Sequence, residues 1–270
     1  MRNEHDKSKM HKATVVAPVV RLVTPTLRNT KSIAAFEDEL LNYFGWQNVA
    51  DFDYDVYSAR NNNGRLKAQA KNAFDDSPTV IVTCGSQATL FAMGFTTTIP
   101  IIQAAGGQAP SAPNVTGFTI NAESTALDHL NTMTATAITV LYDDTNPPSV
   151  AVFNKLNANV PMGKTLKPLK ISDPKKFGPQ PAMDGFMVIP NAMYYSHSAA
   201  IAAMVDGNAN EIYYPEREYK NAHRKKNNVS VHGHHIQNNF RQAAGYVNRI
   251  LLGATIAQLP SFDNAVNDGD

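Results

Sequence analysis

Short apolar runs alternate with amphipathic stretches along nearly the whole chain, which predicts alternating β-strands and α-helices. Several of these runs are rich in β-branched residues and do not alternate with polar ones, as is typical of parallel strands buried on both faces. The predicted strands cover residues 14–23, 52–57, 80–82, 99–102, 115–120, 137–142, 165–171, 186–190, 211–214 and 229–232. The predicted helices cover residues 32–44, 66–74, 88–94, 124–136, 149–157, 195–204 and 236–252. The alternation therefore predicts an α/β protein with mainly parallel sheets.

The strand and helix cycle restarts near residues 114–121, after a loop rich in proline, serine and alanine, so we expect two similar Rossmann-like lobes. The expected first lobe comprises residues 13–118 plus 233–256, and the second comprises residues 119–232 plus 257–270. Residues 1–12 are polar and are expected to be a disordered tail or one added by cloning. Such a division makes the chain cross between the lobes more than once, which would keep a hinge motion reproducible.

Residues 79–107 contain two strand ends made of small residues, as one wall of a ligand cleft would require. The strand at 80–82 is followed by Cys84-Gly85-Ser86, where Gly85 permits a sharp turn and Ser86 can cap the next helix. The strand at 99–102 is followed by Ala104-Ala105-Gly106-Gly107. In open α/β sheets, ligands bind in the crevice at the carboxyl ends of the strands. The segment therefore indicates half of a cleft, although two ordinary turns explain it equally well.

Polar and aromatic residues also follow two predicted strands in the second half. Asn191 comes directly after the strand at 186–190 and can form directional hydrogen bonds, and Tyr194 or Tyr195 offers a flat surface and a hydroxyl. One core tyrosine and one surface tyrosine explain the pair nearly as well. After the strand at 211–214, Arg217 can pair with a ligand carboxylate, and a salt bridge to Glu216 or Glu218 is the alternative.

Composition excludes several classes of function. A net charge of +1 with 17% charged residues gives no basic surface for nucleic acid. The longest apolar runs are too short to cross a membrane, and the polar start lacks the features of a secretory signal. The lone Cys84 excludes an internal disulfide and is expected to be a small buried residue.

No motif indicates catalysis, a cofactor or a metal. Gly163-Lys164-Thr165 lacks the first glycine of a phosphate-binding loop, because Ala158 stands at that position, and it precedes a strand instead of following one. His232-Gly233-His234-His235 is expected to form an exposed turn, because no acidic residue or cysteine accompanies it. No nucleophile, base and acid form a catalytic set. We therefore expect a protein that is not an enzyme and that needs no cofactor.

Four segments resemble the substrate-binding proteins of ABC transporters with the type I periplasmic-binding fold, in the branch that includes tryptophan- and phenylalanine-binding members. They are residues 81–89 with 98–107, residues 114–118, residues 184–201 (DGFMVIPNAMYYSHSAAI) and residues 241–260 (RQAAGYVNRILLGATIAQLP). The similarity covers residues 14–260. It implies two lobes joined by a hinge of three crossovers and a protein that binds a solute without chemical change.

The resemblance also implies where a ligand is held. A ligand carboxylate would lie at the helix N-terminus that contains Gly85, Ser86 and Gln87, with further contacts from the end of the first strand and from the second lobe. The complete set of expected ligand-binding residues is Thr24, Pro25, Gly85, Ser86, Gln87, Ala105, Gly106, Asn191, Tyr194, Tyr195 and Arg217.

The implied function is to trap a small organic molecule, an amino acid or another carboxylate, and to deliver it to an ABC transporter permease. The expected partners are this ligand and, if the protein is exported, the permease. The resemblance implies a periplasmic location although the chain shows no signal peptide, and a cytoplasmic location is the alternative. The alternative function is a cytoplasmic ligand-sensing or regulatory module that keeps the binding fold without a transporter. Because the chain ends soon after Pro260, where members of the family continue, we expect a weakened third crossover.

Overall fold

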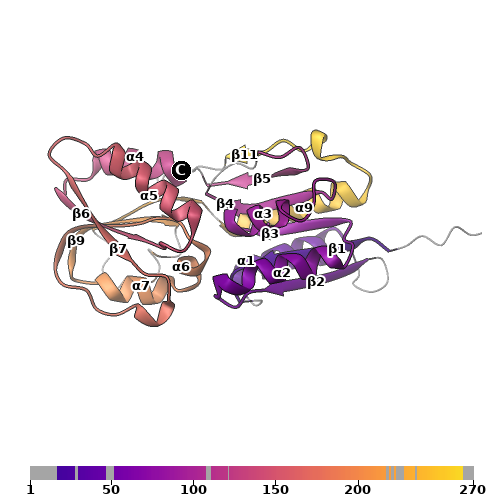
Figure 1. Ribbon diagram of the computed structural model, residues 1–270, viewed down its shortest axis with the longest axis horizontal. Helices are drawn as coiled ribbons and strands as arrows, with labels where there is room; N and C mark the ends of the chain where they lie inside the picture. The colour runs from indigo at the N-terminus through magenta and orange to yellow at the C-terminus, as the bar shows by residue number, and fades with distance from the viewer. Residues whose placement is uncertain are drawn as a thin grey trace, which may run out of the picture.

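The computed structural model describes residues 17–27, 30–46, 52–107, 111–120, 122–216, 219, 222, 228–234 and 236–263. These residues form two α/β lobes that lie side by side, each built around one parallel sheet (Figure 1). The predicted fold class is confirmed. The expected residues 1–12 of the tail and 264–270 of the C-terminus lie outside the described residues.

The first lobe contains a six-stranded sheet in the order β11-β5-β4-β3-β1-β2. Helices cover both of its faces, as expected when parallel strands are joined by helical crossovers. Its strands are β1 (Val19–Thr24), β2 (Asp53–Ser58), β3 (Val80–Cys84), β4 (Ile101–Gly106), β5 (Val115–Thr119) and β11 (Phe262–Asp263), and its helices are α1 (Lys31–Glu37), α2 (Asn63–Asp75), α3 (Ser86–Met93) and α9 (Ile236–Leu251). A π-helical turn (Asp38–Tyr43) continues α1.

Successive side chains of β1 pack on opposite faces of this sheet, because a strand alternates its side chains. Val20 and Leu22 belong to the apolar cluster that also contains Phe36 of α1 and Phe240 of α9. Val23 belongs to the cluster made with α2 and α3. Every residue of β4 is buried, which explains why this strand reads as a short apolar run without alternation.

The second lobe contains a five-stranded sheet in the order β10-β9-β8-β6-β7. Its strands are β6 (Ala137–Tyr142), β7 (Thr165–Lys170), β8 (Met183–Val188), β9 (Ala209–Glu216) and β10 (Val229–His234), and its helices are α4 (Ala122–Thr132), α5 (Pro147–Ala158), α6 (Ala192–Ser196) and α7 (Ser198–Val205). Two single turns of 3-10 helix, Pro174–Lys176 and Ile256–Gln258, complete the described elements.

The described chain passes between the lobes twice, from β5 to α4 and from β10 to α9. The expected return of residues 257–270 to the second lobe is wrong for the described residues 257–263. There β11 pairs with β5 through Phe262 and Phe118, and the Phe262 ring stacks on the Phe118 ring with their centroids 6.2 Å apart. The aromatic edge of the first sheet therefore keeps this segment in the first lobe, and the described residues contain no third crossover.

Local details of three predicted elements differ from the structure. The helix predicted at 195–204 is two helices, α6 and α7, because the backbone at His197 (φ −117°, ψ 24°) leaves the helical region. The helix predicted at 124–136 ends at Thr132. The N-cap of α3 is Gly85, at φ +87°, and Ser86 is the first helical residue instead of the cap. Within the described ranges, no helix has both the length and the apolar character needed to cross a bilayer.

Candidate ligand-binding cleft

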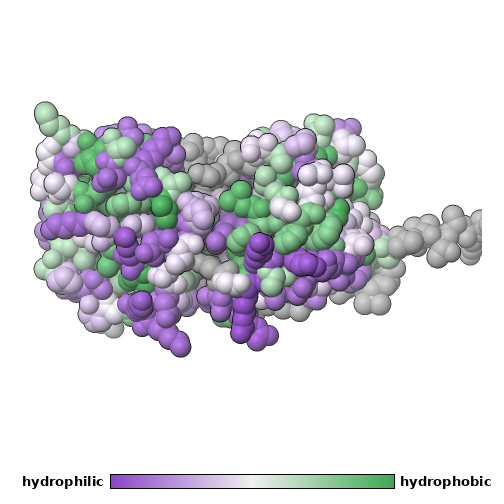
Figure 2. Space-filling view, in the orientation of Figure 1, coloured by the Kyte–Doolittle hydropathy of each residue, from purple (hydrophilic) through white to green (hydrophobic). Residues whose placement is uncertain are grey.

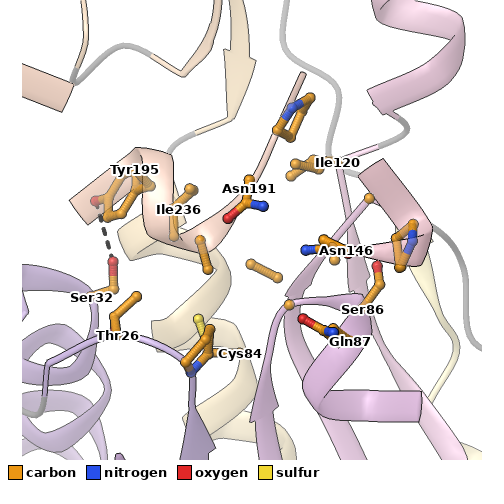
Figure 3. Close-up of a pocket in the computed structure, with 18 of the residues that line it drawn as sticks. Thr26, Ser32, Cys84, Ser86, Gln87, Ile120, Asn146, Asn191, Tyr195 and Ile236 are labelled. Atoms are coloured by element: carbon orange, nitrogen blue, oxygen red, sulfur yellow. Dashed lines mark hydrogen bonds between the residues drawn. The ribbon is translucent and has the colours of Figure 1, made fainter. Parts of the chain in front are cut away.

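The two lobes lie side by side in Figure 2, and a cleft lies between them at the carboxyl ends of the strands of both sheets (Figure 3). The loops after β1, β3 and β4 form one wall, and the loops after β6 and β8 form the other. This is the position at which open parallel sheets bind ligands. The described residues that line it are Pro25, Thr26, Thr30, Ser32, Cys84, Gly85, Ser86, Gln87, Ala105, Gly106, Gly107, Ile120, Asn146, Pro148, Val152, Pro190, Asn191, Ala192, Tyr195 and Ile236.

The enclosed space is small in this arrangement of the lobes. The centre of a water molecule can occupy about 80 Å³ of it, and one water needs roughly 10–15 Å³ by the same measure. The whole hollow, including its open mouth, amounts to about 890 Å³. The cleft therefore has room for a small molecule, and a larger one would enter only if the lobes moved apart.

The N-terminus of α3 opens into the first wall. Gly85 adopts a backbone conformation that side chains disfavour, and its N–H donates to the carbonyl of Ala105 at 2.5 Å. This bond ties the end of β3 to the end of β4. The N–H groups of Ser86 and Gln87 belong to the first helical turn, where no partner exists within the helix. Together with the helix dipole, they make this wall attractive to an anionic group.

Asn191 holds the start of α6 in the second wall. Its Oδ1 accepts from the N–H of Met193 at 2.8 Å, and its Nδ2 donates to Oδ2 of Asp143 at 3.2 Å. Asp143 is fully buried, and its other carboxylate oxygen accepts from the backbone and hydroxyl of Thr145. An amide nitrogen carries two hydrogens. Asn191 therefore works mainly as a helix cap, and one of its two amide hydrogens is engaged by Asp143.

A hydrogen bond joins the two lobes at one end of the cleft. The hydroxyl of Ser32, in α1, lies 3.3 Å from the hydroxyl of Tyr195, in α6 (Figure 3). Because one partner comes from each lobe, this contact exists only while the lobes are close together. It marks the described arrangement as one in which the walls of the cleft have approached each other.

Two polar atoms of the lining are buried without a hydrogen-bond partner among the described residues. They are Oγ of Ser86, at the start of α3, and Oδ1 of Asn146, just before α5. α3 and α5 contact each other across the cleft, and Figure 3 shows the two side chains in the same part of it. Since buried polar groups in native proteins are almost always bonded, this pair indicates a place for a polar ligand group.

The cleft carries no charged side chain among the described residues that line it. Burial raises the pKa of the Cys84 thiol to about 12, against a smaller opposing effect of its hydrogen bond with Thr24. The thiol is therefore protonated at neutral pH and is a poor nucleophile. Over the described ranges, no three histidine, cysteine or acidic side chains gather as a metal site would require.

The structure brings eight of the expected ligand-binding residues together in the lining: Pro25, Gly85, Ser86, Gln87, Ala105, Gly106, Asn191 and Tyr195. Two others do not line the cleft. Thr24 is fully buried, and its hydroxyl bonds to that of Thr26. Tyr194 lies in the core of the second lobe, where its hydroxyl donates to the carbonyl of Ile171 at 2.7 Å. Arg217 lies outside the described residues, as does the side chain of each residue in 232–235.

The loop after β6 contributes Asn146 and Pro148 to the second wall, and neither residue is among the expected ligand-binding residues. A signal was present, because the predicted strand at 137–142 ends in a polar turn with two prolines. Ligands bind at the carboxyl ends of the strands in open α/β sheets, so this turn belongs to the same crevice as the turn after the strand at 80–82. Thr26, Thr30 and Ser32 were also missed, and nothing in the sequence distinguishes them from other hydroxyls in loops and first helical turns.

Comparisons with known proteins place the fold. No family model and no curated protein matches the sequence. Among solved structures, the chain is similar to an ABC domain from Streptococcus pneumonia in complex with L-Trp, at 13% identity and a TM-score of 0.72 over 93% of this chain and 90% of that one. It is also similar to a conserved domain protein from Vibrio cholerae, at 16% identity and a TM-score of 0.72 over 92% and 89% of the two chains.

A third similar structure is an ABC sugar transporter subunit from Rhodobacter sphaeroides, at 13% identity and a TM-score of 0.63 over 92% of this chain and 96% of that one. These similarities extend over both lobes. At sequence identities this low, they show a shared fold and nothing more. The chain has the two-lobed α/β fold of the type I periplasmic-binding proteins.

Proposed function

We propose that this protein is a solute-binding protein that traps a small organic carboxylate between its two lobes. The observation that carries the proposal is the cleft itself, which is built from strand ends of both sheets and into which the N-terminus of α3 opens. A ligand in this position touches both lobes at once. Its binding would therefore favour the closed arrangement over any open one, because it gains contacts only when the walls meet.

The lining matches a carboxylate with a small apolar body. The N–H groups of Ser86 and Gln87 can each donate to a carboxylate oxygen, and the described walls hold no acidic side chain that would repel it. Apolar atoms face the rest of the space. They come from Pro25, Ala105, Ile120, Pro148, Val152, Pro190, Ala192 and Ile236.

Delivery of the ligand to an ABC transporter permease, outside the cytoplasm, is the second part of the proposal. Its support is the likeness in fold to a subunit of an ABC sugar transporter and to an ABC domain that binds L-Trp. The cleft also lacks, in its described lining, the reactive groups that a catalytic site would need, since its thiol is held protonated. Binding followed by release is thus the activity that the site supports.

The experiment is a thermal-shift screen of amino acids, hydroxy acids and simple carboxylates against the purified protein. A ligand at 100 times its Kd stabilises the folded state by about 2.7 kcal/mol, which raises the midpoint of a chain of this size by roughly 5–10 °C. A screen in which no carboxylate moves the midpoint contradicts the proposal. A shift caused only by neutral sugars would keep the binding function and refute the carboxylate.

Ser86→Pro tests the helix N-terminus directly. Proline is well tolerated at the first helical position and removes its N–H, and Gly85, at ψ 152°, already has a ψ in the range that a residue before proline prefers. Loss of a hydrogen bond to a charged group costs about 1.5–3 kcal/mol, so we expect affinity for a carboxylate to fall by roughly 10- to 150-fold. Ser86→Ala, which keeps the N–H, is the matched control and should lose less. Equal losses in the two variants would show that the N–H group does not hold the carboxylate.

A further inference from the structure

We propose that the ligand carries an uncharged hydroxyl beside its carboxylate, and that Asn146 and Ser86 select for this hydroxyl. The inference rests on the proposed function and names the class of ligand within it. A hydroxy acid would then be the preferred ligand, ahead of the amino acid of the same shape.

The two buried atoms differ in their hydrogen-bonding chemistry. Oδ1 of Asn146 is an acceptor only, so a ligand satisfies it by donating a hydrogen. Oγ of Ser86 can donate or accept. A ligand hydroxyl placed between them can donate to Asn146 while it accepts from Ser86, which satisfies both protein atoms with one group. A carboxylate oxygen or a methyl group cannot do so, because neither has a hydrogen to donate.

These two atoms lie beside the proposed carboxylate site. Ser86 supplies both the unpartnered Oγ and the first free N–H of α3. A group bound at Oγ is therefore adjacent to a group bound at the N–H, and the two belong to neighbouring carbons of one ligand. Asn146 closes this point from the other lobe, as Figure 3 shows. A 2-hydroxy carboxylate has this arrangement of groups.

The charge of the lining distinguishes a ligand hydroxyl from a ligand ammonium. An ammonium could also donate to Asn146, but its charge would be buried in a lining that holds no acidic side chain among the described residues. Burying a charged ammonium whose only counter-charge is the ligand's own carboxylate costs more than burying a bonded hydroxyl. Asp143, a carboxylate of the second wall, does not line the cleft and accepts hydrogen bonds from Asn191 and Thr145. The neutral donor is therefore favoured.

The two residues also bear on closure of the lobes. Asn146 belongs to the second lobe and Ser86 to the first, so a hydroxyl bonded to both links the lobes directly across the cleft. A ligand without the hydroxyl leaves both atoms buried and unpaired in the closed state. An unsatisfied buried group costs about 1–3 kcal/mol. The pair thus acts against closure on the wrong ligand as well as in favour of closure on the right one.

The test is isothermal titration of the purified protein with ligands matched in shape. One set is lactate, alanine and propionate, and a second is 2-hydroxy-4-methylpentanoate, leucine and 4-methylpentanoate. We expect the hydroxy acid of at least one set to bind at least tenfold more tightly than its two partners. Binding of the simple acids reports on the proposed function, and the ratio of hydroxy acid to simple acid reports on this inference. Equal affinities within each set would overturn the inference and leave the proposed function standing. No binding by any of the six would overturn the inference for these ligands, and the thermal-shift screen of carboxylates then decides the proposed function separately.

Variants then assign the selectivity to Asn146. In Asn146→Ala, the ratio of the affinity for the hydroxy acid to the affinity for the simple acid should fall from at least ten to near one. In Asn146→Asp, which keeps an acceptor and adds a negative charge, the preference should move toward the amino acid. The matched control is Asn159→Ala, at the other end of α5 and outside the lining, which should leave the ratio unchanged. Thermal midpoints without ligand check that each variant folds. A folded Asn146→Ala that keeps the full ratio would refute the role of this residue.

Discussion

The close approach of two strands in the first sheet predicts a large cost for one added methyl group. Gly117 of β5 pairs with Gln103 of β4 and has φ +143°. A Cβ at position 117 would lie 2.1 Å from the backbone oxygen of Gln103 and 2.7 Å from its backbone nitrogen. Both are backbone atoms in the middle of a sheet. They cannot give way as a flexible side chain would, so Gly117→Ala must push β4 and β5 apart.

The magnitude follows from two separate effects. A residue with a side chain in such a backbone conformation costs about 1–3 kcal/mol, and forcing extra volume into a packed core costs a further 1–3 kcal/mol or so. Alanine also restricts the unfolded chain, which returns about 0.4–1 kcal/mol. We therefore expect Gly117→Ala to lower the free energy of unfolding by about 3 kcal/mol.

Two other glycines of the same lobe separate these effects. Gly253 follows α9 at φ +97°, and a Cβ at this position would have nothing within 4 Å, so Gly253→Ala should cost about 1 kcal/mol for conformation alone. Gly245 lies within α9, where a Cβ would meet Phe44 at 3.9 Å, an ordinary contact. Gly245→Ala should stabilise the lobe by about 0.5–1 kcal/mol, because alanine favours the helix.

The assay is denaturation in urea, followed by the fluorescence of Trp46. This is the only tryptophan of the chain, and its Nε1 bonds to Asn248 of α9, so it reports on the first lobe. The expected order of stability is Gly245→Ala, wild type, Gly253→Ala and then Gly117→Ala. A cost for Gly117→Ala no greater than that of Gly253→Ala would refute the reasoning, because the contact with Gln103 would then contribute nothing.

Three further predictions concern an ion-pair network and the contact between the lobes. Arg21 is almost fully buried in β1 and bonds to Asp76 at 2.8 Å. Arg21→Met should lower the free energy of unfolding, measured by urea denaturation, by about 2 kcal/mol. This is less than a fully buried ion pair would cost, because the Asp76 carboxylate is partly hydrated. Hydrogen bonds from Tyr57 and then from Arg21 hold the pKa of Asp76 below its usual value. The ionised Asp76 therefore stabilises the folded state above about pH 4, and this contribution is lost as the pH falls further. In urea denaturation from pH 7 to pH 3, the free energy of unfolding should fall less in Asp76→Asn than in the wild type. Equal falls would contradict the role of Asp76. Tyr195→Phe removes the hydroxyl that meets Ser32 across the cleft, so the ligand affinity measured by calorimetry should fall by roughly 2- to 10-fold. Ser32→Ala should lower the affinity by the same factor, and the double variant should lower it no further. Additive losses would show that the two hydroxyls act separately.

The fold was predictable from the sequence because buried parallel strands leave a strong trace. Ile81 and its neighbours in β3 are buried on both faces, and so the apolar run shows where the strand lies. The break at His197 was not predictable, since it depends on one backbone conformation between two segments that each favour a helix. The two-residue strand at Phe262 was missed for a different reason. Its place in the sheet depends on stacking with Phe118, a contact between residues far apart in the chain.

The same limit applies to the candidate site, where residue types were visible and their orientation was not. Asn191 was predicted as a direct ligand contact because an amide after a strand can bond in either direction. In the structure Met193 and Asp143 occupy most of its bonding capacity. Asn146 stands in a similar position after β6 and keeps an unpartnered oxygen. Nothing in the sequence tells these two amides apart, because the difference lies in which backbone and side-chain groups fold next to each one.

The orientation of the α3 N-terminus also depends on contacts that the sequence does not show. The hydroxyl of Thr89 lies 2.9 Å from Oε1 of Gln103, 2.7 Å from the hydroxyl of Thr83 and 3.1 Å from the carbonyl of Gly85. The amide of Gln103 fills the space beside Gly106, where a Cβ would lie 2.3 Å from it. One buried polar cluster therefore connects the turn at Gly85, the floor of the cleft at Gly106 and the close approach of β4 to β5. Hydrogen bonds are directional, whereas apolar contacts are not. The free N–H groups of α3 are thus aimed into the cleft by polar contacts within the sheet, and the same residues that make Gly117 intolerant of a methyl group also position the proposed carboxylate site.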